Sequence, residues 1–402
     1  MLPTAYLWMV DTFALRRGTW SISSGTKYGV EMWRGLDIEE AIFFLLTNTL
    51  IVSGLVAFDN ALAILDTFPE HFSRLSGLPS PVRLIQALFF SQDRYDQERV
   101  AGLINATSLL QNKSRSFFLA SAAFEGRLRI DLVRLYAFCR AADDLVDEAA
   151  SVDDAKMWIN KLKLYLDVAF GGMVDKRSTS EFLEHVKLEF PSWARLALLQ
   201  LPTDYIPKQP LEDLLRGFET DVRFSTEFPI SSTDDLDLYA SQVAGTVAEL
   251  CNRLILFHTP HSTTTEACNR LIDAGVEMGI ALQYVNIARD IATDAGIGRV
   301  YIPNAWLDEK SMTPEEVIQN PSRPAIEEFR QRLLDRAFAK YEIARAAIDE
   351  LPSEARGPIR VAVESYMEIG RVLREGNHKI RQGRATVPLW RRIRVAWSAL
   401  GQ

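Results

Sequence analysis

Two separate segments of this chain carry aspartates at helical spacing on an otherwise apolar background. A helix turns by about 100° per residue, so four polar side chains of the segment QYVNIARDIATD (residues 283–294) share one narrow stripe: Gln283, Asn286, Asp290 and Asp294. The segment LYAFCRAADDLVDE (residues 135–148) repeats this arrangement with Tyr136, Arg140, Asp143 and Asp147. Apolar residues occupy the remaining sides. The sequence therefore predicts two helices that face one cavity with their carboxylates.

The carboxylate pairs need positive charge. Two like charges four positions apart on a helix cost about 0.2–0.5 kcal/mol when exposed and more when partly buried. Mg²⁺ prefers oxygen ligands and is usually held by one or two carboxylates, waters and phosphate oxygens. Two such helices would therefore hold Mg²⁺ around a diphosphate. The alternative is that each DxxxD is a coincidental surface pair; an arginine beside each pattern, Arg140 and Arg289, favours the metal interpretation.

Composition limits the classes of protein to consider. The chain has 402 residues, of which 48% are hydrophobic and 24% charged, enough for one large or two medium domains. Its net charge of −8 argues against a nucleic-acid binder, which needs a basic surface. The three cysteines form no CxxC pair and the five histidines do not cluster, so neither a disulfide scaffold nor a zinc site is indicated. An intracellular, reducing compartment fits this pattern.

An uncharged run precedes the acidic helices. Residues 41–58, AIFFLLTNTLIVSGLVAF, would form a helix about 27 Å long, close to the thickness of a bilayer core. This run is interpreted as a membrane span, with a buried helix of a soluble core as the alternative. Arginines on both sides leave its orientation open. The turn-forming sequence GLPSP at residues 77–81 predicts a domain boundary.

The remainder is predicted to be all-α. Five segments have helical periodicity and end at Pro, Gly or Ser breaks: residues 130–148, 240–257, 266–293, 325–350 and 356–380. Residues 171–180 are expected to form a surface loop. The C-terminal segment PLWRRIRVAW (residues 388–397) mixes arginine with Trp, Ile and Val, so it either lies on a membrane surface or packs as a terminal helix on the core.

Several motifs resemble a known family. They are SRSFFLA (114–120), YAFCRAADDLVDE (136–148), YASQVAGTVAEL (239–250) and ALQYVNIARDIATDAGIGRVYIP (281–303), and in this order they resemble the squalene and phytoene synthase family over residues 105–385. The sequences ALRRGTW (14–20) and IEEAIFFLLTN (38–48) resemble the end of the membrane lycopene cyclase domain that fungi fuse to phytoene synthase. The expected organisation is a cyclase remnant (1–75), a linker (76–104) and a synthase domain (105–402).

The resemblance implies an all-α isoprenoid synthase fold, a helical bundle around a central cavity. It also implies a head-to-head condensation of two geranylgeranyl diphosphates to phytoene through prephytoene diphosphate, with Mg²⁺, or alternatively Mn²⁺. The metal-holding residues implied are Asp143, Asp144, Asp147, Asn286, Asp290 and Asp294. Tyr136 and Arg140 join the four stripe aspartates as catalytic residues. The positions implied to contact substrate are Ser114, Ser116, Phe117, Tyr239, Val243, Ala244, Gly245, Gln283, Asn286, Arg289, Arg299 and Tyr301.

One position departs from the pattern, and several alternatives stay open. Thr293 stands where many relatives have an acid, which would change a water or metal shell. The alternatives are a squalene-type synthase using farnesyl diphosphate and NADPH, a non-catalytic scaffold, and a bifunctional enzyme with lycopene β-cyclase activity if more chain precedes Met1. With one clear span, this chain alone is not expected to cyclise lycopene. The resemblance implies a membrane-associated, intracellular protein whose synthase domain faces the cytosol and contacts other carotenoid enzymes.

Overall fold

The chain divides into two compact units. The computed structural model describes residues 2–23, 25, 28–72, 79–171, 180–259, 264–375 and 387–400. The first unit is Met1–Tyr95 and the second is Asp96–Gln402. The predicted surface loop lies almost entirely outside the described residues, as does the end of the segment predicted as a helix over 356–380.

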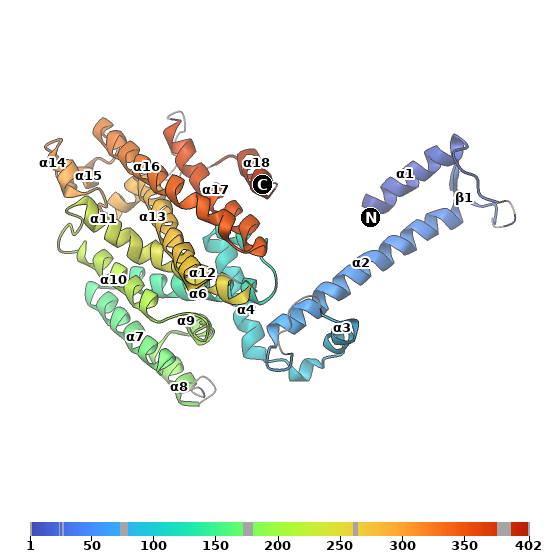
Figure 1. The fold of residues 1–402 in the computed structure, drawn as a ribbon, viewed down its shortest axis with the longest axis horizontal. Helices are drawn as coiled ribbons and strands as arrows, with labels where there is room; N and C mark the ends of the chain where they lie inside the picture. The colour runs from blue at the N-terminus through green and yellow to red at the C-terminus, as the bar shows by residue number, and fades with distance from the viewer. Residues whose placement is uncertain are drawn as a thin grey trace. The chain divides into compact units, whose positions relative to one another are not determined.

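The first unit is built from helices and one short hairpin (Figure 1). Its elements are α1 (Leu2–Arg16), β1 (Glu31–Trp33), β2 (Leu36–Asp37), α2 (Ile38–Thr67), α3 (Pro81–Leu88) and the 3₁₀ turn η2 (Gln92–Arg94). Gly35 takes a φ of +89° in the hairpin turn, a conformation that glycine adopts at little cost. The Trp8 indole donates a hydrogen bond of 3.0 Å to the Ala41 carbonyl, which holds α1 against the start of α2.

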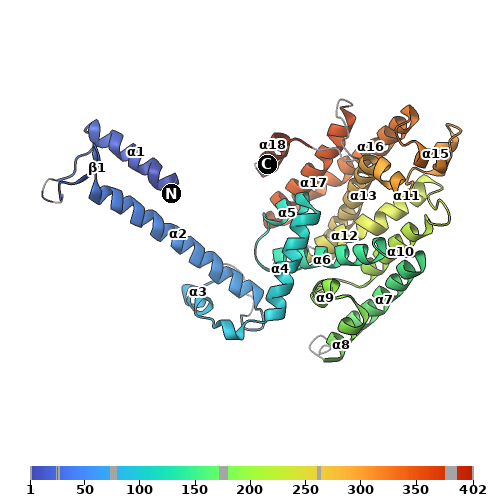
Figure 2. The ribbon, with the colours of Figure 1, turned by 180° about the vertical axis from the view of Figure 1, so that it is seen from behind.

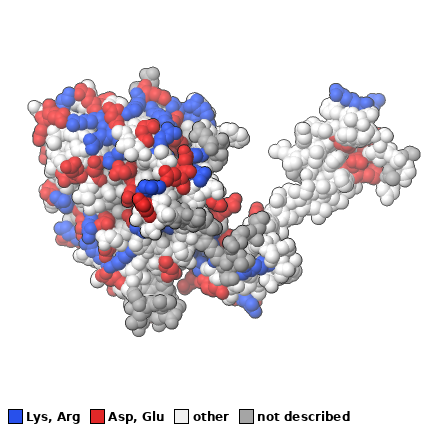
Figure 3. Space-filling model, in the orientation of Figure 1, with Lys and Arg blue, Asp and Glu red and all other residues white. Residues whose placement is uncertain are grey.

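Helix α2 is long, apolar and mostly uncovered. It contains 30 residues, its most apolar 18-residue window has a mean hydropathy of 2.1, and only 6% of that window is buried within the structure. Figure 3 shows it as a surface almost without charged side chains. At about 1.5 Å per residue, it is long enough to cross a hydrocarbon core of about 30 Å. By length and composition it is the single helix among the described residues that meets this criterion.

The second unit contains only helical elements among its described residues, and Figures 1 and 2 show it from opposite sides. The helices before the central one are α4 (Gln97–Lys113), α5 (Arg115–Ser121), α6 (Gly126–Asp147), α7 (Val152–Phe170), α8 (Ser180–Glu189), α9 (Ser192–Leu199), α10 (Gln209–Arg223), α11 (Thr233–Ala240), the π-turn η3 (Ser241–Gly245) and α12 (Thr246–His258). The rest are α13 (Thr265–Gly296), α14 (Asn304–Asp308), α15 (Pro314–Gln319), α16 (Pro324–Ala344), the 3₁₀ turn η4 (Arg345–Glu350), α17 (Ser353–Arg374) and α18 (Leu389–Leu400).

Helix α13 is the centre of this unit. Thr264 caps its start by accepting a hydrogen bond of 3.3 Å from the Ala267 backbone N–H. Its neighbours include α12, α16, α17 and the π-turn η3. Tyr284 and Ala288 on α13 are fully buried in a core shared with Leu333 of α16. A second hydrophobic core joins α6, α7, α10 and α12. These two cores position the carboxylate-bearing helices α6 and α13.

The predicted all-α class is confirmed, but two predicted segments are not single regular helices. The segment 240–257 is helical throughout, as predicted, but it includes the π-turn Ser241–Gly245 between α11 and α12. The segment 325–350 changes to 3₁₀ geometry at Arg345. A π-turn inserts one extra residue into a helical turn and is frequent at functional sites. Side-chain periodicity does not reveal it, because the helix continues on both sides.

Candidate functional site

Helix α6 presents its acidic edge together with basic side chains. The Arg140 guanidinium lies 2.9 Å from the Asp143 carboxylate and also donates to Asp144. Lys113, the last residue of α4, approaches Asp144 to 3.3 Å. Tyr136, two helical turns before Asp143, shares a hydrogen bond with the side chain of Ser114. In the first predicted motif, Asp143 and Asp144 therefore each contact a basic side chain.

Helix α13 carries the second predicted motif in a similar setting. The Asn286 amide donates a hydrogen bond of 3.2 Å to the Gln283 side chain, and Asn286 accepts one from the hydroxyl of Tyr366 on α17. The Arg289 Nε donates to the Asp290 carboxylate at 2.8 Å. Tyr366 was missed in the sequence, although it follows Val363 by one helical turn on a face that is largely buried.

The turn after α13 carries Arg299, which contacts both acidic helices. Gly298 has a φ of +80°, which permits the turn that follows the helix. The backbone N–H of Arg299 then donates to the Asp294 carbonyl at 2.8 Å, and its guanidinium donates to the Asp147 carboxylate at 2.7 Å. Arg299 thus lies where the ends of α6 and α13 meet.

A further aspartate lies among the predicted ones. Asp221 of α10 accepts hydrogen bonds from the hydroxyls of Tyr301, at 2.7 Å, and Tyr239, at 3.2 Å. The two tyrosine rings stack with centroids 5.0 Å apart. Sequence reasoning missed Asp221. The sequence does indicate its position, because Asp221 follows Leu214 by seven residues and so lies on the buried face of α10.

The carboxylates repel one another in this half-buried space. Burial, then repulsion from Asp147, raises the pKa of Asp143 from 3.8 to about 7. Burial, then repulsion from Asp290, raises the pKa of Asp294 to about 7. Burial raises the pKa of Asp221 to about 6 despite the nearby Arg299. The site therefore favours additional positive charge, either protons or a bound cation.

An apolar cavity extends along α13 from this acidic cluster. It is open to solvent on one side, and the space within its walls, solvent included, is about 1080 Å³. Its lining includes small and aliphatic side chains from η3, α12, α13, η4 and α17: Val243, Ala244, Val247, Ala248, Leu271, Ala274, Gly275, Met278, Ala347, Ile348, Leu351, Ile359, Ala362 and Val363. Its α13 lining spans residues 271–286, about 22 Å at helical rise. Gln283, Asn286 and Tyr366 line the end toward the aspartates, and Asn252 lines the other end.

The π-turn shapes this cavity where it crosses α13. A Cβ on Gly279 would lie 2.6 Å from the Ala244 carbonyl oxygen, so only glycine permits this close approach. Gly245 in turn packs against Val276, and a Cβ there would be 3.0 Å from that side chain. The crossing brings the backbone of η3 onto α13 and turns Val243 and Ala244 toward the cavity.

The predicted site residues therefore fall into separate groups. Five of them line the cavity: Phe117, Val243, Ala244, Gln283 and Asn286. Gly245 contributes to helix packing, and Tyr239 and Tyr301 orient Asp221. The side chain of Ser116 lies outside the described part of the structure. Within that part, no three acidic, histidine or cysteine side chains converge closely enough to hold a metal ion by themselves.

Solved structures share this helical architecture. A dehydrosqualene synthase solved with a ligand has a TM-score of 0.59 at 21% identity, with 76% of this chain and 97% of that chain covered. The squalene synthase HpnC from Alicyclobacillus acidocaldarius has a TM-score of 0.54 at 22% identity, with 70% and 95% covered. The second unit accordingly has the all-α isoprenoid synthase fold.

Sequence comparison defines the family. The squalene/phytoene synthase family model matches residues 110–391. A protein of Gibberella fujikuroi (strain CBS 195.34 / IMI 58289 / NRRL A-6831) described as bifunctional lycopene cyclase/phytoene synthase is 64% identical over 404 residues, which cover all of this chain and 70% of that protein. A protein of Phaeosphaeria nodorum (strain SN15 / ATCC MYA-4574 / FGSC 10173) with the same description is 56% identical and is covered over 68% of its length. The chain belongs to the squalene/phytoene synthase family.

Proposed function

We propose that this chain is a phytoene synthase that condenses two molecules of geranylgeranyl diphosphate head to head. In each of two successive steps, one diphosphate and one proton leave; prephytoene diphosphate is formed first and phytoene second. The relatives described as bifunctional lycopene cyclase/phytoene synthase support this activity. The observation that carries the proposal is the apolar cavity whose lining reaches Gln283 and Asn286, one helical turn before Asp290 on α13.

Basic side chains around the aspartates would bind the diphosphate groups. Arg140, Arg289 and Arg299 each contact a carboxylate of the site. Guanidinium groups donate several hydrogen bonds in a geometry that suits phosphate oxygens. As a diphosphate leaves an allylic carbon, negative charge builds on its oxygens, and donors fixed in advance stabilise that charge. The contacts to aspartate keep these side chains near the place where the leaving group forms.

The donor set fits Mg²⁺ shared with substrate. Carboxylates on two helices, none of which forms a closed cage, suit an ion that completes its shell with water and phosphate oxygens. We assign Asp143, Asp147, Asp290 and Asp294 to this role, with Asp144 and Asn286 adjoining them. When bound, Mg²⁺ supplies Lewis-acid stabilisation of the departing diphosphate. Mn²⁺, with similar oxygen coordination, is expected to substitute.

The cavity would hold the prenyl chains and protect the carbocations. Its walls are mainly aliphatic, and Phe117 and Tyr366 lie 6.1 Å apart, ring to ring, at the end near the aspartates. Aromatic faces attract cations, and an apolar wall excludes water that would trap an allylic cation as an alcohol. The ordered chain geometry brings the reacting double bond next to the ionised carbon.

The first unit is proposed to attach the enzyme to a membrane. Helix α2 supports this through its length and exposed apolar surface. The chain spans 70% of the length of one relative described as bifunctional and 66% of another, from Fusarium fujikuroi. We propose that residues 1–75 correspond to part of a cyclase domain, residues 76–104 to a linker and residues 105–402 to the synthase. We also propose, from the family resemblance, that the synthase domain faces the cytosol next to other carotenoid enzymes.

Product analysis tests the proposed activity. The purified chain is incubated with geranylgeranyl diphosphate and Mg²⁺, without a reduced nicotinamide, and the hydrocarbons are extracted and identified. Phytoene is expected, because proton loss rather than hydride transfer ends the reaction. A squalene-type synthase would require NADPH and prefer farnesyl diphosphate. Dependence on NADPH, or full activity in EDTA, would contradict the proposal.

A further inference from the structure

Helix α18 faces the solvent with its large apolar residues Trp390, Ile393 and Trp397, and its Arg391 faces the protein. Trp390, Ile393 and Trp397 lie within about 60° of one another around the helix and are 61%, 58% and 81% exposed. The opposite side contains Ala399, which is buried. A helix that packs on a core normally turns its tryptophans inward, because each buries a large apolar area. The polarity of α18 is therefore reversed.

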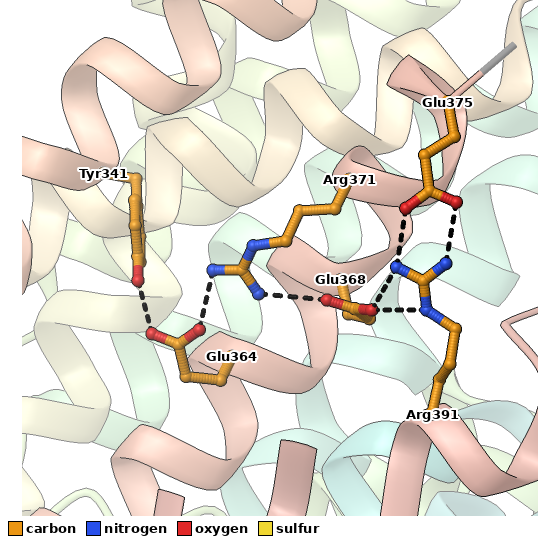
Figure 4. Close-up of polar contacts among 6 residues, drawn as sticks. All are labelled: Tyr341, Glu364, Glu368, Arg371, Glu375 and Arg391. Carbon is orange, nitrogen blue, oxygen red and sulfur yellow. Dashed lines mark hydrogen bonds and ion pairs between the residues drawn. The ribbon is translucent and has the colours of Figure 1, made fainter. Parts of the chain in front are cut away.

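Ion pairs hold α18 in this orientation (Figure 4). Arg391 lies 2.7 Å from Glu368 and 2.7 Å from Glu375, both carried by the C-terminal part of α17 or the residue that follows it. Arg371 also contacts Glu368, and it links that carboxylate to Glu364. The Glu368 side chain is only 4% exposed, so Arg391 compensates a buried charge. Rotation of α18 to bury its tryptophans would break these contacts.

We propose that the exposed face of α18 binds the surface of a membrane that contains anionic lipids. Residues 387–402 contain no acidic residue, although the whole chain has a net charge of −8. Of their three arginines, Arg391 is paired with Glu368 and Glu375, whereas Arg392 and Arg394 have no acidic partner among the contacts described. Tryptophan is enriched where hydrocarbon meets headgroups, and nearby arginines attract anionic lipid. Arg394 lies over the Trp390 ring at 5.4 Å, beside the apolar stripe. These features are typical of a helix that lies in a bilayer interface.

This contact would place the second unit at the lipid surface independently of α2. Helix α18 is fixed to α17, and α17 also contributes Tyr366 to the end of the cavity near the aspartates. The inference rests on the exposed face and the ion pairs of α18, and it does not require the proposed synthase activity. Its test therefore uses no substrate and no measurement of turnover.

A fluorescent probe at the apolar face tests the inference in the full chain. Trp397→Cys is labelled with an environment-sensitive dye, and the protein is reconstituted with vesicles of phosphatidylcholine alone or with phosphatidylserine. The matched control is Leu188→Cys on α8, where an apolar side chain is 79% exposed on the same unit. Unmutated protein treated with dye corrects for labelling of the three native cysteines.

The expected result is a shift of the Trp397 probe to shorter emission wavelength on anionic vesicles, with several-fold stronger quenching by nitroxide lipids than for the Leu188 probe. High salt and Arg394→Glu should both weaken the effect, whereas Arg270→Glu, at an arginine 64% exposed on α13, should not. A Trp397 probe that stays in water while the chain sediments with the vesicles would overturn the inference. So would an apolar signal without vesicles, which would indicate coverage by protein, or equal signals at both positions.

Discussion

Arg299 donates a hydrogen bond to Asp147 across 2.7 Å, and this contact joins the turn after α13 to the last residue of α6. Asp147 belongs to the first acidic motif, and Arg299 follows the second one by five residues. Asp221 lies close enough to interact electrostatically with Arg299 and with Asp147. Asp294 of α13 also interacts electrostatically with Arg299. One guanidinium therefore serves carboxylates from three helices, and its removal should affect all of them.

Arg299→Gln should lower turnover by roughly 10²-fold, the usual effect of removing one donor that stabilises developing charge. The amide keeps a donor but loses the positive charge opposite the leaving diphosphate. Steady-state kinetics on geranylgeranyl diphosphate would measure the change. Arg270→Gln is the matched control, because Arg270 is on α13 but contacts only the exposed Glu350, at 3.6 Å, among the contacts described. Equal turnover in Arg299→Gln and the unmutated protein would exclude the assigned role.

Asp143→Asn and Asp290→Asn should each lower turnover by about 10³-fold or more while the protein stays folded. Each change removes a charged oxygen ligand but relieves repulsion on its own helix. Melting temperature and circular dichroism would verify the fold. Asp167→Asn, at a carboxylate 61% exposed on α7, should leave turnover unchanged. Near-normal activity of either site variant at saturating substrate and Mg²⁺ would refute the metal assignment.

The stability of the metal-free protein should fall as pH rises through about 7. The folded-state pKa of Asp143 and of Asp294 is raised to about 7 from 3.8, so the folded protein binds more protons than the unfolded chain between these values. The free energy of unfolding therefore decreases with rising pH in this window. Denaturant titrations in EDTA from pH 5 to 8 would measure it. The double variant Asp143→Asn/Asp294→Asn should flatten the dependence, and an unchanged slope would argue against these shifts.

Substitution of alanine for glycine should change the stability of the protein differently at two positions on α13. A Cβ at Gly279 would lie 2.6 Å from the Ala244 carbonyl, so Gly279→Ala should cost about 1–3 kcal/mol of stability and narrow the cavity. Gly296 has no neighbour within 4 Å of the new atom, and alanine there should be neutral or stabilising by up to about 1 kcal/mol. Thermal unfolding of both variants would measure the difference. Equal stability would mean that the crossing at η3 is looser than the structure indicates.

Helical periodicity in the sequence was sufficient for the fold class and for the two acidic stripes. Both depend on residues within one helix, where the spacing of side chains determines the shared face. Gln283 and Asn286 were also on the stripe, whereas Phe117, Val243 and Ala244 came from resemblance alone, and all five line the cavity. Their convergence depends on how three elements, α5, η3 and α13, pack together, which local spacing does not specify.

Asp221, Tyr366 and the π-turn at η3 were missed for physical reasons. Asp221 is a single acid whose role depends on two tyrosines distant in the sequence, Tyr239 and Tyr301. Tyr366 reaches Asn286 only because α17 packs on α13. The π-turn packs the Ala244 carbonyl closely against Gly279, a tertiary contact that local spacing does not specify.

The central claim is that one chain holds two prenyl diphosphates between the motifs of α6 and α13. Calorimetric titration with a non-hydrolysable thiolo analogue of geranylgeranyl diphosphate, in the presence of Mg²⁺, measures the number bound without turnover. The account predicts two analogue molecules per chain, with binding strongly weakened by EDTA and with at least one molecule lost in Asp143→Asn or Asp290→Asn. Binding of one molecule per chain, or binding unaffected by EDTA, would contradict it.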